Sequence, residues 1–300
     1  MTVKAAIDCG SNMSRLLISG PDGEVDRRLE FTRLGEGVDA SGRLTADAMR
    51  RTAGVLSNYR ELMDAHGVTR FRAIATSAAR DAANVHEFQL LASAALGQSI
   101  DVIDGGEEAR LSFAGATAGR SETEETLVVD IGGGSTEMAF GHPGSAPLTV
   151  SMDIGAVRVT ERFLTSDPPS AEELSQAVSV VRLHLQEARM FHPELLGARA
   201  LIGVAGTFTT MAAVEIGLVE YDRDRVHGFQ LDRAAAEDVF RTLATEPLAA
   251  RVHNPGLAPE RADIIVGGCI IAVGIMREFG LGGCEVSERD LLDGIVASLD

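Results

Sequence analysis

The sequence predicts an α/β protein built from two similar domains. Three observations point to this class. One β-hairpin pattern occurs twice, a further strand and a long amphipathic helix follow each copy, and the length of 300 residues suits two domains better than one. We expect the domains to cover residues 1–121 and 122–300, with the final segment from Ser287 able to pack back on the first domain.

The repeated hairpin is visible when "AAIDCGSNMSRLLISGPDGE" from Ala5 is placed above "LVVDIGGGSTEMAFGHPGSA" from Leu127. Each copy has an apolar run, Asp-x-Gly, a small polar cluster, a second apolar run and a Gly/Pro turn. This order is typical of two antiparallel strands joined by a tight turn. A third strand is expected in "RLEFTRLGEG" after the first copy and in "LTVSMDIGAVRV" after the second.

Helical periodicity follows each group of strands. Apolar residues at i, i+3 and i+4 predict one helix from the N-cap Thr45 to Gly67, and another from Ser170 to Pro193. Apolar runs predict further strands at "RFRAIATSA", "SIDVIDG" and "RALIGVAG". The uncharged run "IIVGGCIIAVGIM" is too short to span a bilayer and predicts a buried helix.

Composition excludes several classes of function. The net charge of −17 disfavours nonspecific nucleic-acid binding, which needs a basic surface. Lys4 is the only lysine, so the P-loop of ordinary nucleotidases is absent. Cys9, Cys269 and Cys284 form no C-x-x-C pair and are expected to be buried hydrophobes. The amino-terminal residues lack a signal-peptide pattern, so we expect a cytoplasmic protein with no membrane association.

The second hairpin turn has three consecutive glycines, which are costly to order, and the first is a Gly/Ser turn. Such turns let backbone N–H groups close on an anion, and they recur in proteins that hold phosphate chains. Asp8 and Asp130 stand at matching places; either alone would more often cap its turn, but the repetition favours a functional role. With Glu137, they suit Mg²⁺, which binds one or two carboxylates while keeping phosphate oxygens and waters in its shell.

The predicted architecture resembles the actin-like fold (ribonuclease H-like, ASKHA superfamily), whose two domains face each other across a cleft. More specific motifs are "AIDCGSNMSRLLI", "RLGEG", "DVIDGGEEARLSFAGA", "VVDIGGGSTEM", "SMDIGAVRVTERF" and "VHGFQL". In their order they are similar to the exopolyphosphatase and guanosine pentaphosphate phosphohydrolase (Ppx/GppA) family, in its short two-domain form. The resemblance runs from about Ala5 to the end of the sequence.

The resemblance implies a Mg²⁺-dependent hydrolase that releases orthophosphate from the ends of inorganic polyphosphate. It places Glu108 of "EEARL" at the position of the catalytic base. Asp130 and Glu137 are further catalytic candidates, and the metal would be held by Asp8, Asp130 and Glu137. The expected phosphate-binding residues are Gly10, Ser11, Asn12, Arg15, Arg80, Gly132, Gly133, Gly134 and Ser135.

Alternatives stay open at this point. The same chemistry on the 5′ triphosphate of guanosine pentaphosphate is the nearest one. An ATP-dependent kinase with an actin-like fold is another, and a noncatalytic regulator that binds an alarmone or polyphosphate is a third. For Arg15 and Arg80, the alternative to phosphate binding is a role as partners in surface ion pairs. Members of the family often form dimers, so the resemblance makes a homodimer possible.

Overall fold

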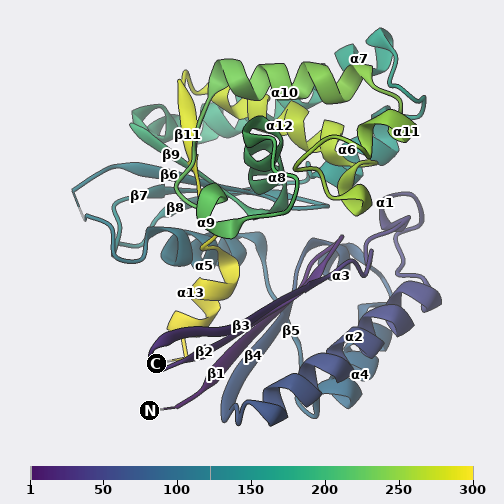
Figure 1. Cartoon of the computed structure of the whole chain (residues 1–300), viewed down its shortest axis with the longest axis vertical. Coiled ribbons are helices and arrows are strands. Elements are labelled where there is room, and N and C mark those ends of the chain that lie inside the picture. The colour runs from purple at the N-terminus through teal and green to yellow at the C-terminus, as the bar shows by residue number, and fades with distance from the viewer. Residues whose placement is uncertain (1, 122, 300) are drawn as a thin grey trace. The chain divides into compact units, whose positions relative to one another are not determined.

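Two mixed β-sheets, each with its own helices, form the framework of the protein in a computed structural model (Figure 1). The structure describes residues 2–121 and 123–299. The chain divides into unit 1, Met1–Gly115 with Leu291–Asp300, and unit 2, Ala116–Asp290. Both units combine strands and helices, which confirms the predicted α/β class.

Unit 1 contains a five-stranded sheet in the order β3-β2-β1-β4-β5. Its strands are β1 (Lys4–Cys9), β2 (Ser14–Gly20), β3 (Gly23–Glu30), β4 (Arg70–Ala75) and β5 (Asp101–Val102). Its helices are α1 (Val38–Ser41), α2 (Ala46–Ala65), α3 (Ser77–Asp81), α4 (Val85–Leu96), α5 (Gly105–Thr117), whose last two residues fall in unit 2, and α13 (Leu291–Ala297).

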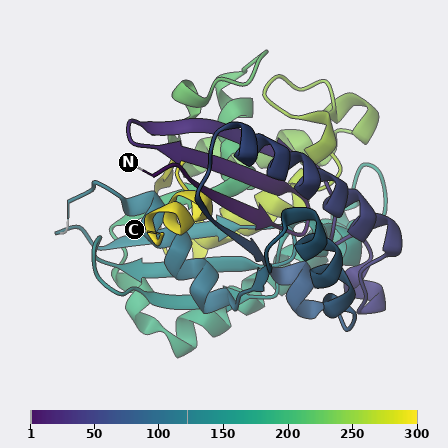
Figure 2. The same ribbon diagram turned by 90° about the horizontal axis from the view of Figure 1, so that it is seen from below.

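Both faces of the unit 1 sheet are covered by apolar packing. Successive residues of β1 point to opposite faces, and they belong to two different apolar clusters. Ala5 and Ile7 belong to one apolar cluster, which includes residues of α2 and α4. Ala6 belongs to a second cluster, with Leu291 and Ile295 of α13. In Figure 2 the dark-blue helices α2 and α4 lie next to each other, as their direct packing requires.

Unit 2 contains a six-stranded sheet in the order β10-β11-β9-β6-β7-β8. Its strands are β6 (Thr126–Ile131), β7 (Thr136–Gly141), β8 (Leu148–Met152), β9 (Ala200–Val204), β10 (Gln230–Asp232) and β11 (Gly283–Val286). Its α-helices are α6 (Ala156–Phe163), α7 (Ala171–Phe191), α8 (Ala205–Ile216), α9 (Arg223–Val226), α10 (Arg233–Thr245), α11 (Leu248–Arg251) and α12 (Ile265–Glu278). One apolar cluster joins this sheet to α7, α8, α10 and α12.

The internal repeat predicted from the sequence is present in the sheets. The order β3-β2-β1-β4-β5 of unit 1 recurs in unit 2 as β8-β7-β6-β9-β11. In both hairpins the strands are antiparallel and the turn has the same length, because Cys9 pairs with Ser14 and Ile131 pairs with Thr136. The two turns, residues 10–13 and 132–135, are therefore structural equivalents.

The predicted helix starts are confirmed by their capping contacts. The Thr45 side chain accepts a hydrogen bond from Ala48 N, and α2 begins at the next residue. Ser170 and Glu173 form a capping box at the start of α7. The apolar run after residue 264 forms the buried helix α12. No helix among the described residues has both the length and the apolar character needed to cross a membrane.

The predicted third strands have different bounds in the structure. β3 begins at Gly23 and ends at Glu30, so most of "RLEFTRLGEG" lies beyond it. β8 ends at Met152, and α6 starts four residues later, within "LTVSMDIGAVRV". In both places the chain leaves the sheet and turns back on the glycine turn of its own unit, where its backbone N–H groups find partners.

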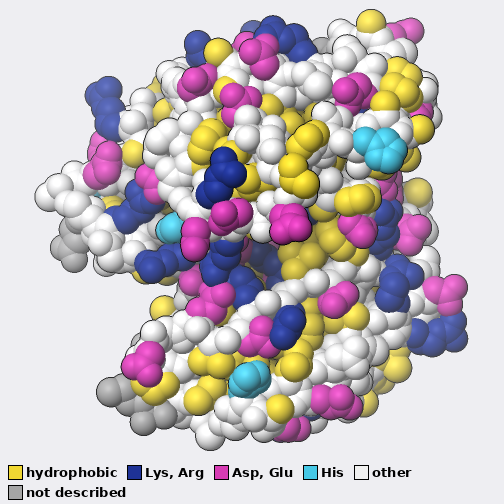
Figure 3. All heavy atoms as spheres, viewed as in Figure 1, with side chains coloured by type: hydrophobic (Ala, Val, Ile, Leu, Met, Phe, Trp, Pro, Cys, Tyr) yellow, Lys and Arg dark blue, Asp and Glu magenta, His cyan; other side chains and the backbone are white. Residues whose placement is uncertain are grey.

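Charged side chains of both signs are mixed over the face drawn in Figure 3. Acidic residues outnumber basic ones, 44 against 27, over the whole chain. A mixed surface with a negative excess repels a polyanion at long range, so a phosphate-rich ligand needs a local source of positive charge or donor groups. The two equivalent turns and their surroundings supply such groups.

Candidate active site

The turn of residues 10–13 in unit 1 has its carbonyl oxygens held by other parts of the unit. The oxygen of Ser11 accepts a hydrogen bond from Gly35 N at 2.7 Å, and that of Asn12 accepts one from Arg33 N at 2.9 Å. A trans peptide directs its C=O and N–H groups to opposite sides. The N–H groups that follow these carbonyls are thus directed away from Gly35, as an anion-binding turn requires.

Side chains reinforce this first turn from the interior. The hydroxyl group of Tyr59 donates to the carbonyl oxygen of Ser14 at 2.8 Å, and the hydroxyl groups of Ser14 and Thr32 lie 2.9 Å apart. Burial is the main cause that raises the pKa of Tyr59, so its hydroxyl group stays protonated and able to donate. Burial also raises the pKa of the Cys9 thiol, which packs as a neutral group.

The turn of residues 132–135 in unit 2 is held in the same way by α6. The carbonyl oxygen of Gly132 accepts from Ala156 N and that of Gly133 accepts from Val157 N, both at 2.9 Å. These donors belong to the first turn of α6, whose N–H groups have no partner within the helix. The N–H groups of Gly133 and Gly134, which follow these carbonyls, again lie on the side opposite to the contact, whereas the N–H group of Gly132 closes the turn by donating to the carbonyl oxygen of Ser135.

Each turn is flanked by a cross-strand pair that includes one predicted aspartate. In unit 1 Asp8 lies directly opposite Arg15, and Arg15 donates from Nη2 to Oδ2 of Asp8 at 2.7 Å. In unit 2 the equivalent residues are Asp130 and Glu137, again directly opposite each other. Side chains of directly opposed residues lie on one face, with Cβ atoms about 5 Å apart. A basic partner in one unit is thus replaced by a second acid in the other.

The acids beside the turns are buried. Asp8, Asp130 and Glu137 are 4, 5 and 1 % exposed, respectively. Ser151 on β8 donates to Oε1 of Glu137 at 2.8 Å, which orients that carboxylate. Two close carboxylates in a buried place repel each other, so the pair of Asp130 and Glu137 favours a cation.

The predicted base, Glu108, lies in the first turn of α5 and is 6 % exposed. Arg80, at the end of α3, donates from Nη1 to Oε2 of Glu108 at 3.2 Å. Its neighbour Glu107 instead accepts from Arg72 at 2.7 Å, so the two glutamates are directed to different partners. Asp104 accepts from Glu107 N at 2.8 Å and thereby caps the start of this helix.

The structure thus brings the predicted arginines to predicted acids within unit 1. Arg15 contacts Asp8 and Arg80 contacts Glu108, although both arginines were expected from the sequence to contact phosphate. The two roles are compatible, because a guanidinium group has five N–H donors and each of these ion pairs uses only some of them. Whether either arginine binds phosphate stays a prediction.

Sequence reasoning missed the residues that hold the turns in place. Gly35, Tyr59 and Gly155 contact the turns from segments that are distant along the chain or that were expected to be strand. The repeated hairpin offered one usable signal: Leu34-Gly35 and Ile154-Gly155 follow their third strands at similar distances. Placing these two segments in one alignment with the hairpins would have revealed the equivalence.

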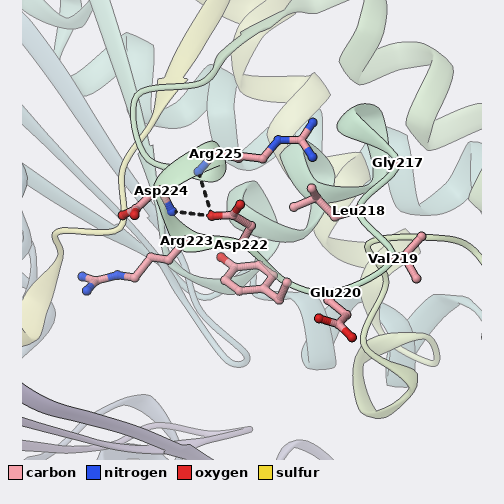
Figure 4. Close-up of a pocket in the computed structure, with 9 residues that line it drawn as sticks. Gly217, Leu218, Val219, Glu220, Asp222, Arg223, Asp224 and Arg225 are labelled. Atoms are coloured by element: carbon pink, nitrogen blue, oxygen red, sulfur yellow. Dashed lines mark hydrogen bonds between the residues drawn. The ribbon is translucent and has the colours of Figure 1, made fainter.

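The structure also has a hollow of about 660 Å³ in unit 2, lined by residues 217–225 (Figure 4). Asp222 accepts hydrogen bonds there from the N–H groups of Asp224 and Arg225 at 3.1 and 3.3 Å, and so caps the short helix α9. Its lining includes none of the site residues predicted from the sequence. The geometry that points to phosphate chemistry lies at the two glycine turns instead.

Comparisons with known proteins agree with this geometry. A model of the Ppx/GppA phosphatase family matches residues 23–299. Exopolyphosphatase 2 of Mycobacterium tuberculosis is 40 % identical, over all of this chain and 99 % of its own length. A crystal structure of an exopolyphosphatase-like protein has a TM-score of 0.91 at 36 % identity, covering 99 % of this chain and 98 % of the other. The Aquifex aeolicus PPX-GPPA enzyme has a TM-score of 0.83 at 32 % identity, covering 99 % of both.

The family model begins at residue 23, so it covers the second glycine turn but not the first. The relatives that align from end to end cover both turns. The motif-based expectation of the family is confirmed by these matches. These matches agree with the repeated hairpin, with the turns whose carbonyl oxygens are held by other segments, and with the buried acids. Together they establish that this chain is a member of the Ppx/GppA phosphatase family.

Proposed function

We propose that this chain is an exopolyphosphatase, which hydrolyses the terminal phosphoric anhydride bond of inorganic polyphosphate. The observation that carries the proposal is the 40 % identity, over the full chain, to a relative named Exopolyphosphatase 2. The chain's own residues support a phosphate-chain substrate, because in both units the carbonyl oxygens of a turn are held by backbone contacts, and the N–H groups that follow these carbonyls lie on the opposite side.

In the proposed reaction, the oxygen of a water molecule attacks the terminal phosphorus atom. The bond from that phosphorus to the bridging oxygen breaks, and orthophosphate leaves a chain that is one unit shorter. Glu108 accepts the proton of the water, and its ion pair with Arg80 orients the carboxylate for that role. Such a reaction needs positioning and charge neutralisation more than covalent chemistry from the protein.

The glycine turns are assigned to the phosphate oxygens. N–H groups of residues 11–12 and 133–135 would donate to them, and the hydroxyl groups of Ser11 and Ser135 would add further donors. The N–H groups of Gly10 and Gly132, which were also expected to contact phosphate, instead close their own turns by donating to the carbonyl oxygens of Met13 and Ser135 at 2.9 and 3.0 Å. Backbone donors fixed by contacts on their far side are preorganised, so they need no rearrangement when the charge on the phosphate oxygens shifts during the reaction. Arg15 and Arg80 would add charge-assisted contacts.

The donor set fits a divalent cation, for which we propose Mg²⁺. Asp130 and Glu137 offer hard oxygen ligands on one face of a hairpin of unit 2, and Asp8 holds the equivalent position beside the turn of unit 1. No group of three or more potential His, Cys, Asp or Glu ligands occurs within residues 2–121 and 123–299. The pair of Asp130 and Glu137 suits Mg²⁺, which binds through one or two carboxylates and otherwise keeps water and phosphate oxygens. When bound, the cation would neutralise charge on the phosphate chain.

The test is the release of orthophosphate, with Mg²⁺, from short polyphosphate, long polyphosphate and guanosine pentaphosphate in parallel. We expect release from polyphosphate, with guanosine pentaphosphate the poorer substrate. Glu108→Gln should lower kcat by about 10²- to 10⁴-fold, the usual contribution of a positioned base. Glu107→Gln is the matched control, because it changes a neighbouring acid that contacts Arg72 instead.

Two results would contradict the proposal. Release of phosphate only from guanosine pentaphosphate would move the assignment to the other activity that gives the family its name. No release from any of the three by a folded protein would favour a binding function, which titration with the same compounds would then detect.

A further inference from the structure

We propose that Gly35 and Gly155 are positioning residues for catalysis. Each packs closely against one of the two glycine turns on the side of the turn's carbonyl oxygens, and this packing fixes the direction of the turn's N–H groups. The kinetic test of this inference rests on the proposed function, and its geometry is that of each unit taken separately. It concerns two residues that contact no substrate in the proposal, so their effect is indirect.

The two glycines occupy equivalent places in the repeat. Each follows the third strand of its unit and is preceded by a buried aliphatic residue, Leu34 in one unit and Ile154 in the other. Each approaches the second residue of its turn, which is Ser11 in unit 1 and Gly133 in unit 2. The same device therefore occurs twice, in segments whose other residues differ.

In unit 1 there is no room for a side chain at Gly35. A Cβ atom there would lie 2.9 Å from Cβ of Ser11 and 3.2 Å from Cβ of Ala78. Gly35 N also donates to the carbonyl oxygen of Ser11, the shortest of the backbone contacts to this turn at 2.7 Å. A methyl group at Gly35 would therefore push the turn and lengthen the bond that orients it.

In unit 2 the approach is closer and involves only backbone. A Cβ atom on Gly155 would lie 2.4 Å from the carbonyl oxygen of Gly133 and 2.6 Å from the carbonyl carbon of Gly134. Backbone φ is −141° at Gly155, an extended value that any residue adopts. The requirement for glycine is thus one of space and not of backbone conformation.

These contacts matter for chemistry because the turns act through direction. Their carbonyl oxygens are fixed by Gly35, Arg33 and the first turn of α6, and this fixes the N–H groups on the opposite side. A Cβ contact below 3.0 Å cannot persist, so either the turn or the segment that carries the glycine must move when a methyl group is added, and either movement changes the contact that orients the turn. Displacement of reacting groups by as little as 1 Å can cost about 100-fold in rate.

The experiment compares Gly155→Ala and Gly35→Ala with Gly54→Ala. Gly54 lies in α2, is exposed, and would place its Cβ atom in open space. For each variant we would measure kcat and KM for polyphosphate per folded molecule, with the folded fraction taken from circular dichroism and thermal unfolding. The dissociation constant for orthophosphate, from calorimetry, gives a readout that does not need turnover.

We expect Gly155→Ala to lower kcat by about 100-fold, with KM changed by less than about threefold, since misalignment acts on the reacting geometry more than on the attraction of a long polyanion. Gly35→Ala should lower kcat by about 10-fold, because its nearest contacts are side-chain atoms that can shift. Both should weaken orthophosphate binding by at least threefold. Gly54→Ala should stay within twofold in every quantity.

Several results would overturn the inference. One is unchanged kcat per folded molecule in Gly155→Ala and Gly35→Ala, even with lower thermal stability, since that describes a structural role only. Another is an equal loss in Gly54→Ala, and a third is failure of both test variants to fold. If the unmodified chain releases no phosphate, the proposed function fails, and the orthophosphate dissociation constants alone then decide whether the glycines position the turns.

Discussion

Arg80 links Glu108 to the backbone of unit 1: its Nη1 atom donates to Oε2 of Glu108 at 3.2 Å and to the carbonyl oxygen of Ile103 at 2.9 Å. The carbonyl contact fixes the guanidinium group, and the guanidinium group in turn orients the carboxylate. A base that must meet one water molecule in one direction benefits from such an orientation.

We therefore expect Arg80→Met to lower kcat for phosphate release by about 10- to 100-fold, because Glu108 loses its orienting partner and the phosphate loses a charged donor. Arg72→Met is the matched control, since it removes the ion-pair partner of Glu107, which lies on the same helix as Glu108. Steady-state release assays on both variants check this. Similar losses in the two would show that general destabilisation of α5 is responsible.

The pair of Asp130 and Glu137 leads to a prediction about divalent cations. Treatment with EDTA should abolish phosphate release, and Mg²⁺ should restore it. Glu137→Gln should raise the Mg²⁺ concentration for half-maximal activity by about 10-fold or more, because one of two opposed carboxylates is neutralised. Glu61→Gln, an exposed acid on α2, should leave that concentration unchanged. Full activity in EDTA would contradict the metal assignment.

Arg251 is expected to be important for the stability of unit 2. It is 3 % exposed and donates to the carbonyl oxygens of Leu243, Ala262 and Glu246 at 2.7, 2.9 and 2.7 Å. Arg251→Met would leave these carbonyl groups without that donor, and each buried group so affected costs about 1–3 kcal/mol. We expect the free energy of unfolding to fall by about 3–5 kcal/mol in urea titrations.

The control for that loss is Arg241→Met. Arg241 is exposed and pairs only with Asp238, three residues away on the same helix, among the contacts described. Exposed pairs of this kind contribute little, so the change should stay within about 0.5 kcal/mol. A loss for Arg251→Met that is no larger than the loss for Arg241→Met would contradict the role assigned to the buried guanidinium group.

Buried thiols predict a loss of stability in alkali, and burial raises the pKa of all three, Cys9, Cys269 and Cys284. Burial raises the pKa of Cys269 and Cys284 from 9.0 to about 12. In the unfolded chain these thiols lose their protons near pH 9, so above that pH the unfolded state binds fewer protons and stability falls until about pH 12. Each thiol contributes up to about 1.4 kcal/mol per pH unit. Thermal unfolding between pH 8 and 11 checks this.

The double variant Cys269→Ala/Cys284→Ala separates these two thiols from Cys9 and from other groups that titrate in alkali. It should be less stable than the parent at pH 8, because two buried sulfur atoms are lost. Its stability should nevertheless fall less steeply as the pH rises. Parallel curves for parent and variant would mean that the thiols do not carry the effect.

Much of the fold could be predicted from the sequence because local chemistry determines it. The Thr45 and Ser170 caps and the two hairpins rest on neighbouring residues, and each appears where the pattern places it. The third strands were placed less well. Their apolar and β-branched residues continue past the ends of β3 and β8, but tertiary hydrogen bonds to the turns remove those segments from the sheets.

The candidate site was predictable in part for a similar reason. Asp8, Asp130 and Glu137 lie within the repeated motif, so their spacing alone places them beside the turns. The partners of these groups are set by contacts across the chain: Tyr59 reaches Ser14 over 45 residues, and Arg80 reaches Glu108 over 28. Nothing in the local sequence indicates such pairs, because they depend on how helices pack on the sheet.

The contact between α6 and the second glycine turn has an electrostatic consequence. The first N–H groups of a helix carry its partial positive charge, and here they donate to the carbonyl oxygens of Gly132 and Gly133 instead of to a ligand. A peptide group that accepts at oxygen becomes a stronger donor at nitrogen. The helix dipole is thus relayed through one layer of peptide groups, so the turn can present to an anion a polarisation that originates in α6.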